Sequence, residues 1–144
     1  MKHLLLLSVF LFSNAFAEIY KDYEPSEKHI QLTVVAVESN YLDDYLVNLN
    51  KTYIREMEVM KELGYIIDYG VYTSDSANSP NVWFTVTYEN MGAMQPNEEQ
   101  YKQVRKILKE RFGESDEEIE SISKGYEEIR KMVDNQIINK VKFK

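Results

Sequence analysis

The chain has 144 residues, enough for one domain with one hydrophobic core, and 24 acidic against 17 basic residues give it a net charge of −7. This charge argues against a nucleic-acid partner, because an acidic surface repels the phosphate backbone. The absence of cysteine excludes disulfides, thiol chemistry, cysteine-bound metals and a lipid anchor attached to cysteine.

The N-terminal segment 1–17 has the three parts of a secretory signal peptide. Lys2 gives a positive start, an apolar block occupies 4–12, and Ala15-Phe16-Ala17 matches the small-residue pattern of a cleavage site. The block is shorter than the ~20 residues needed to cross a bilayer. We therefore expect cleavage after Ala17, no membrane insertion afterwards, and a periplasmic or secreted location.

The mature chain is expected to begin with a flexible arm and to continue as a single domain over 29–144. Segment 18–28 is polar, contains Pro25 and has no apolar period. From His29 to Glu38 the residues alternate with a period of two, which predicts a strand. One side of this strand carries Ile30, Leu32, Val34 and Ala36, and the other carries His29, Gln31, Thr33, Val35 and Val37.

A long helix and two strands are predicted next. Apolar residues recur at spacings of three and four over 42–63, with Asn40 as the expected N-cap and Gly64 as the residue that ends the helix. Segments 65–73 and 81–89 are rich in β-branched and aromatic residues, and turn-forming residues separate them. The two segments are therefore predicted to be strands.

The last third of the chain predicts two helices and a short strand. Asn97 and Ser115 are expected N-caps, and Gly113 ends the first of these helices. The second helix is predicted to run toward Asn139, after which 141–143 forms a short strand.

This order of elements, β-α-β-β-α-α-β, is that of a ferredoxin-like α+β domain with an antiparallel sheet and helices on one face. We predict that the covered face carries Ile30, Leu32, Val34, Ile67, Tyr69, Val71, Val82, Phe84, Val86, Val141 and Phe143. The opposite face then carries His29, Gln31, Thr33, Val35, Val37, Ile66, Asp68, Tyr72, Trp83, Thr85 and Thr87. This second face is too apolar for open water and too polar for a dry core. We expect a second copy to cover it and to enclose an amphipathic cavity.

The chain resembles the dimeric α/β-barrel superfamily, in which small ferredoxin-like domains pair sheet to sheet. The resemblance covers about residues 29–144 and rests on the element order, the helix ending at Gly64-Tyr65, and the stretches Val71-Tyr72-Thr73, Asn81-Val82-Trp83-Phe84 and Tyr88-Glu89-Asn90-Met91. Within the superfamily the chain resembles uncharacterised exported members. This resemblance implies a homodimer. Relatives include cofactor-free monooxygenases, haem-degrading enzymes, and dechlorinating and isomerising enzymes. Membership of the fold transfers none of these reactions.

Six residues of the predicted cavity face are candidate ligand contacts: His29, Thr33, Asp68, Tyr72, Trp83 and Thr85. A carboxylate desolvated among aromatic rings has a raised pKa and can move protons, and an indole can stack on a planar ligand. Alternatively, Trp83 fills a dimer interface, and Asp68 pairs with Lys140 or Lys142 of an edge strand.

His29 is the one histidine that follows the predicted signal peptide. It is either a general base or haem ligand at the cavity mouth, or an incidental surface residue. The acidic run over 114–120 lacks the spacing and glycine turn of a calcium loop and suits a helix N-terminus. We expect neither a metal nor a cofactor.

Three functions remain open at this level. The first is an exported protein that binds a small, partly aromatic ligand in the cavity of a dimeric barrel. The second is a cofactor-independent monooxygenase or isomerase that uses Asp68, Tyr72 and His29. The third is a non-catalytic interaction module of the cell envelope.

Overall fold

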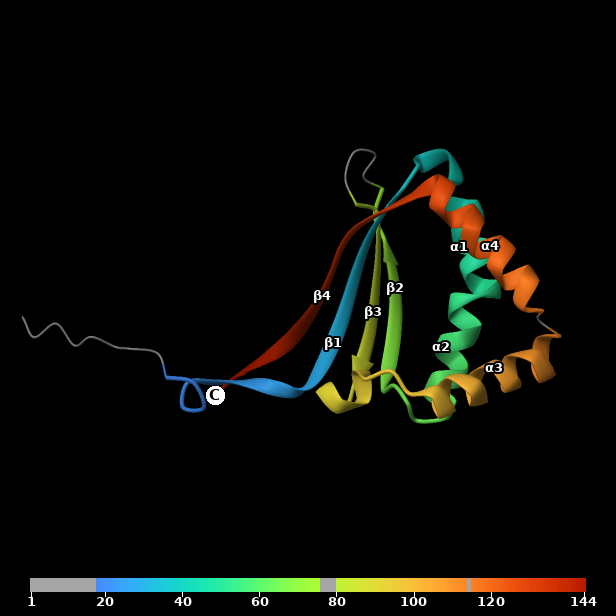
Figure 1. Ribbon diagram of the computed structural model, residues 1–144. Helices are drawn as coiled ribbons and strands as arrows, with labels where there is room; N and C mark the ends of the chain where they lie inside the picture. The colour runs from blue at the N-terminus through green and yellow to red at the C-terminus, as the bar shows by residue number, and fades with distance from the viewer. Residues whose placement is uncertain (1–17, 76–79, 114) are drawn as a thin grey trace, which may run out of the picture.

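The computed structural model describes residues 18–75, 80–113 and 115–144 (Figure 1). The predicted signal peptide, 1–17, lies outside these residues. The described chain contains a four-stranded antiparallel sheet in the order β2-β3-β1-β4, which confirms the ferredoxin-like α+β prediction. Its strands are β1 (Tyr23–Val37), β2 (Asp68–Thr73), β3 (Val82–Tyr88) and β4 (Arg130–Phe143).

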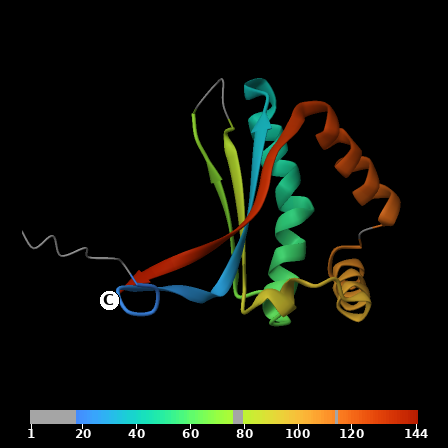
Figure 2. The ribbon, with the colours of Figure 1, turned by 60° about the vertical axis from the view of Figure 1, so that its left-hand side comes forward.

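The helices form a layer on one face of the sheet, as predicted (Figures 1 and 2). They are α1 (Leu42–Lys51), α2 (Tyr53–Glu62), α3 (Glu98–Phe112) and α4 (Asp116–Ile129), with short 3-10 turns η1 (Ser39–Tyr41) and η2 (Met91–Met94). The side chains of Asn97 and Ser115 accept hydrogen bonds from Gln100 N–H and Glu118 N–H, which confirms both predicted N-caps. Gly113 ends α3 with φ of +67°.

The long helix predicted over 42–63 is divided at Thr52, where φ is −122° and ψ is −86°. The Thr52 hydroxyl bonds to the Asn48 carbonyl and to the Tyr126 hydroxyl. Side chains of this kind offer the backbone an alternative to helical bonding. The predicted cap Asn40 lies inside η1, and no side chain caps α1.

Two predictions about the ends of the chain are wrong. β1 begins at Tyr23, so the second half of the predicted flexible arm is paired with β4. The predicted helix toward Asn139 ends at Ile129, and β4 takes its place. The β-branched residues of this segment favour a strand. Pairing along β1 stabilises that strand in place of the predicted helix. The outer ends of β1 and β4 extend beyond the rest of the sheet as a two-stranded ribbon (Figure 1).

The register shows which side of each strand faces the helices. Val35 and Thr33 pair with Val82 and Phe84, and the residues of this side pack under α1 and α4. The buried core there comprises Val35, Val37, Tyr45, Leu49, Val82, Phe84 and Tyr126. The predicted orientation is therefore confirmed for β3 and reversed for β1.

The face away from the helices is formed by rows of cross-strand neighbours. These rows are Tyr72, Trp83, Val34 and Asp134; Gly70, Thr85, Leu32 and Gln136; and Asp68, Thr87, Ile30 and Ile138. We call these residues the open face. Val141 and Phe143, predicted to lie under the helices, are exposed instead. A period of two shows which residues share a side of a strand but not which side meets the helices.

Candidate functional site

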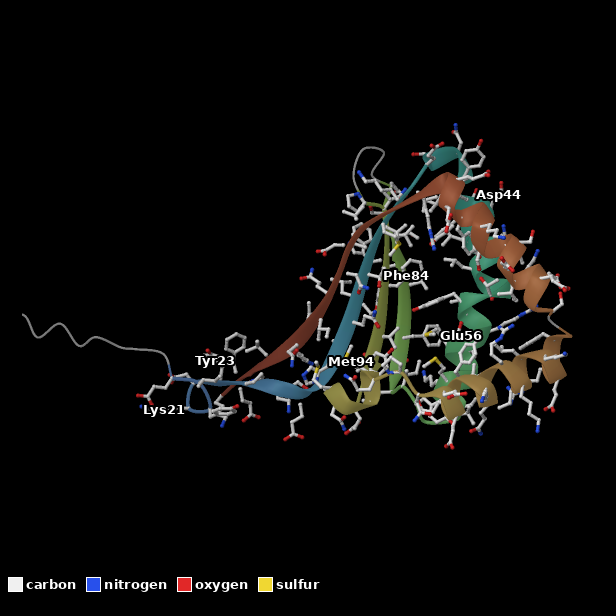
Figure 3. The ribbon with its side chains drawn as sticks, viewed as in Figure 1. Lys21, Tyr23, Asp44, Glu56, Phe84 and Met94 are labelled. Carbon is white, nitrogen blue, oxygen red and sulfur yellow. The ribbon has the colours of Figure 1, made fainter. Side chains whose placement is uncertain are left out.

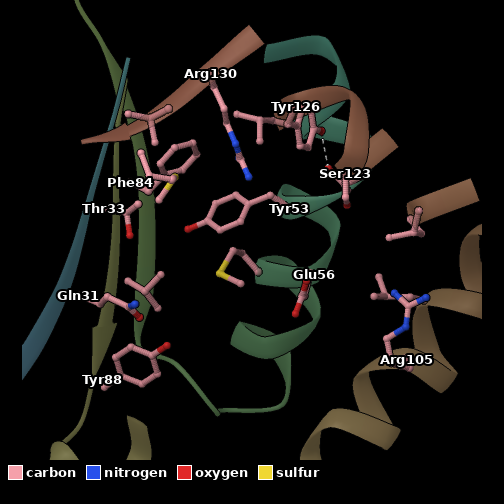
Figure 4. Close-up of a pocket in the computed structure, with 18 residues that line it drawn as sticks. Gln31, Thr33, Tyr53, Glu56, Phe84, Tyr88, Arg105, Ser123, Tyr126 and Arg130 are labelled. Carbon is pink, nitrogen blue, oxygen red and sulfur yellow. Dashed lines mark hydrogen bonds between the residues drawn. The ribbon is translucent and has the colours of Figure 1, made fainter. Parts of the chain in front are cut away.

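A cavity of about 350 Å³ lies between the sheet and the helix layer (Figure 4). Phe84 of β3 and Glu56 of α2 both lie in this space (Figure 3). The lining residues are Gln31, Thr33, Val35, Leu49, Thr52, Tyr53, Glu56, Met57, Phe84, Val86, Tyr88, Arg105, Leu108, Ile119, Ser123, Tyr126, Arg130 and Met132. An apolar cavity with a few converging polar groups is the usual form of a small-molecule site.

The floor of the cavity is the helix-facing side of β1 and β3. Here β1 contributes the polar residues Gln31 and Thr33, while Phe84 and Val86 of β3 contribute apolar surface. The more apolar side of β1 lies on the open face. On the helix-facing side Gln31 and Thr33 lie beside the buried Val35 and Phe84, which makes the floor amphipathic.

Tyr53 forms part of the opposite wall, on the first turn of α2. Its ring contacts Phe84 edge to face, with 5.1 Å between ring centroids and 72° between planes. Its hydroxyl is buried and has no hydrogen-bond partner within the described chain. Burial raises the pKa of this hydroxyl, and the neighbouring Tyr88 and Glu56 raise it further. Tyr53 therefore stays protonated near neutral pH and can donate a hydrogen bond into the cavity.

Arg130, at the start of β4, extends into the same cavity (Figure 4). Its Nη1 donates to the Tyr45 hydroxyl at 3.0 Å, and its guanidinium carbon lies 5.0 Å from the Tyr126 ring centroid. The rings of Tyr45 and Tyr126 contact each other edge to face at 5.1 Å. These contacts fix the direction of the guanidinium.

The structure separates the predicted candidate residues. Thr33 lines the cavity, whereas Asp68, Tyr72, Trp83 and Thr85 lie on the open face. His29 lies at the register shift between β1 and β4, with Nδ1 2.8 Å from the Glu27 carbonyl. The structure does not bring His29 together with Asp68 and Tyr72, the set considered for an enzyme.

The Asp68 carboxylate pairs with Lys61 of α2, at 2.7 Å from Nζ, rather than with Lys140 or Lys142. The hydrogen bond from Lys61 lowers the pKa of Asp68, which corrects the expectation of a raised value. Tyr53, Glu56 and Arg130 also line the cavity and were not among the residues predicted from the sequence. Tyr53 and Glu56 lie one helical turn apart, and a carboxylate next to a core tyrosine was the signal available for them.

The buried tyrosines predict a late alkaline titration. Burial is the main cause of the raised pKa values of Tyr45, Tyr53, Tyr88 and Tyr126. Above pH ~10 the unfolded chain releases these protons while the folded chain retains them. The raised pKa values therefore contribute to the free energy of unfolding. This contribution is fully present below that pH and is lost as the pH rises through the pKa values that these tyrosines have in the folded protein.

We expect tyrosinate absorbance to rise in two phases, the later one together with loss of the circular-dichroism signal. Tyr53→Phe should reduce the later amplitude, because burial raises the pKa of the Tyr53 hydroxyl. A single phase near pH 10 with the fold intact would contradict this assignment.

Comparisons with known proteins leave the family unassigned. No family model matches the sequence, and the curated proteins give no match. The structure is similar to that of HapK from Hahella chejuensis, with a TM-score of 0.47 and 7% identity over 78% of this chain and 91% of HapK. It is also similar to a dimeric ferredoxin-like protein from an uncultured marine organism, with a TM-score of 0.39 and 11% identity over 81% and 96% of the two chains. A conserved protein from Methanosarcina mazei has a TM-score of 0.39 and 15% identity over 82% and 94%.

Two further properties concern only the part of the chain that the structure describes. Its helices are too short or too polar to span a membrane. Its histidine, aspartate and glutamate residues form no group of three that could hold a metal ion.

Proposed function

We propose that this protein is an exported homodimer that binds a small, planar, partly aromatic molecule in the cavity between its sheet and helices. The observation that carries this proposal is the orientation of β1. Gln31 and Thr33 face the cavity together with the buried Val35, while Ile30 and Leu32 lie on the open face. Polar groups inside and apolar groups outside suit a ligand in the cavity and a partner on the open face.

The ligand class follows from the lining. Aromatic and aliphatic surface from Phe84, Val86, Met57 and Leu108 suits a flat apolar body. Polar side chains from the sheet and from the helix layer also line the cavity, among them Gln31, Tyr53 and Arg130, and they can orient that body. The volume of about 350 Å³ suits a molecule with one or two fused rings.

The homodimer is supported by two apolar surfaces of the single chain. Tyr72 and Ile138 are exposed on the open face, and Phe143 is 84% exposed on the ribbon. A two-stranded ribbon is marginally stable in water unless something packs against it. A second copy that covers the open face and receives the ribbon accounts for both surfaces.

Export is supported by the pattern of the first seventeen residues. Expression in a bacterial host, followed by intact mass measurement of the envelope fraction, tests it. The expected N-terminus is Glu18, and a retained Met1 in that fraction would contradict export by this route.

Ligand binding is tested by calorimetric titration of naphthol and naphthoquinone into the mature protein. A molecule that binds the folded state also raises the unfolding temperature. Thr33→Leu fills the cavity floor and should weaken binding roughly tenfold or more. Thr85→Leu is the matched control, because Thr85 lies on the open face at the adjacent row. Trp83 also lies there, so its fluorescence is not a direct reporter of the cavity.

The outcomes separate the three functions. Binding that Thr85→Leu weakens and Thr33→Leu spares would place the ligand between the sheets of the dimer and contradict this proposal. Oxygen consumption or isomerisation of the bound probe would indicate an enzyme. If neither naphthol nor naphthoquinone binds, and neither raises the unfolding temperature of the wild-type protein or of the two variants, an interaction module is favoured.

A further inference from the structure

The positive charge of Arg130 has an unusual setting inside the cavity. The side chain is half-buried and contacts the Tyr45 hydroxyl and the ring faces of Tyr45 and Tyr126. All of these partners are neutral. Within the described residues no carboxylate forms an ion pair with Arg130, in contrast to Arg111, whose Nη2 lies 2.7 Å from Glu62.

The guanidinium retains donors for a further partner. A guanidinium has five N–H donors, and the hydrogen bond to Tyr45 uses one of them. The tyrosine contacts hold it on one side, so that its tip points toward the space beside Tyr53 (Figure 4). A positioned guanidinium with unused donors is a typical receptor for a planar carboxylate.

Tyr53 supplies a second donor from another element. Its hydroxyl is buried, has no hydrogen-bond partner within the described part of the chain, and comes from α2 rather than β4. A buried hydroxyl without a partner costs folding free energy, and an acceptor in the cavity would recover it. The acidic side chain Glu56 lies below Tyr53 in Figure 4, on the far side from Arg130.

We propose that the ligand of this cavity is an anion, specifically a planar aromatic carboxylate whose acid group is bound by Arg130 and Tyr53. This inference rests on the proposed function, that the cavity binds a planar molecule. The aromatic body lies against Phe84 and Val86, and the carboxylate lies at the end of the cavity where β4 begins. The carboxylate neutralises the guanidinium and accepts a hydrogen bond from the Tyr53 hydroxyl.

The test compares two probes that differ in charge and little in shape. Naphthoate and naphthamide are titrated calorimetrically into the mature wild-type protein at neutral pH. Because hydrogen bonds to a charged group are stronger than neutral ones, naphthoate is expected to bind roughly tenfold to a hundredfold more tightly. The preference should fall as salt is added, though less steeply than for an exposed ion pair.

Variants of the two donors assign the preference. Arg130→Gln should abolish the difference between the probes, and Arg130→Lys should restore part of it because it retains the charge without the planar fork. Tyr53→Phe should weaken naphthoate binding roughly threefold to tenfold. Arg111→Gln is the matched control, because it removes an arginine charge from the surface and should leave both affinities unchanged. Thermal unfolding of each variant confirms that it folds.

The results distinguish failure of the anion assignment from failure of the proposed function. If both probes bind equally and Arg130→Gln changes neither affinity, the cavity binds planar molecules but the anion assignment is wrong. If neither probe binds the folded wild-type protein, the proposed function itself fails.

Discussion

Replacement of Asn81 by alanine is expected to lower the free energy of unfolding by about 2–4 kcal/mol. Asn81 is a buried polar residue, only 3% exposed, immediately before β3. Its Oδ1 accepts the Val37 N–H at 2.8 Å, and its Nδ2 donates to the Val37 carbonyl at 2.9 Å. The amide therefore replaces a backbone partner where β1 leaves the sheet. Alanine would leave both backbone groups of Val37 buried and unpaired.

Urea unfolding followed by circular dichroism measures this loss. The midpoint should fall while the dependence on urea stays constant, because the same surface is exposed on unfolding. Asn50→Ala is the matched control, since Asn50 is exposed on α1, and it should change stability by less than about 0.5 kcal/mol. Equal midpoints for the two variants would contradict the role assigned to Asn81.

Replacement of Trp83 by aspartate is expected to dissociate the proposed homodimer. Trp83 lies on the open face between Tyr72 and Val34, in the middle of the sheet. In a sheet-to-sheet dimer its side chain is covered, and a carboxylate there would be buried without a partner. The cost corresponds to a dissociation constant that is higher by roughly a hundredfold or more. Light scattering at micromolar concentration should then show a monomer.

A matched pair of surface variants tests the interface independently, in case the Trp83 variant misfolds. Tyr72 on the open face and Val47 on α1 are each 58% exposed. Tyr72→Asp should weaken the dimer, whereas Val47→Asp should leave it intact. A folded wild-type protein that is monomeric at this concentration, or equal effects of the two substitutions, would rule out the proposed interface.

Local signals in the sequence predicted those elements that depend on neighbouring residues. The caps Asn97 and Ser115 and the left-handed Gly113 were predicted correctly, because capping involves residues within one turn. β2 and β3 were predicted from β-branched and aromatic residues between turn signals. The ferredoxin-like fold was predicted from the order of the elements, and the observed strand order agrees with it.

Predictions that depended on distant partners failed. Segment 130–139 has apolar spacings compatible with a helix, but it pairs along β1 as β4. The more apolar side of β1 was predicted to lie under the helices, but a period of two does not show which side meets them, and Gln31 and Thr33 face the helices instead. The candidate set was therefore divided between two faces of the sheet. Tyr53 was not among the candidate residues, because only the fold places its hydroxyl at a cavity wall.

The central claim is that the ligand lies between the sheet and the helices, and methyl-resolved NMR tests it most directly. Mature protein labelled at its methionine, leucine and valine methyl groups is titrated with naphthoate, and with naphthamide as the neutral probe. We predict shifts at the cavity residues Met57, Val86 and Leu108, with Leu32 and Val34 on the open face unchanged. Shifts confined to Leu32 and Val34, or none at any of these methyls, would contradict the account.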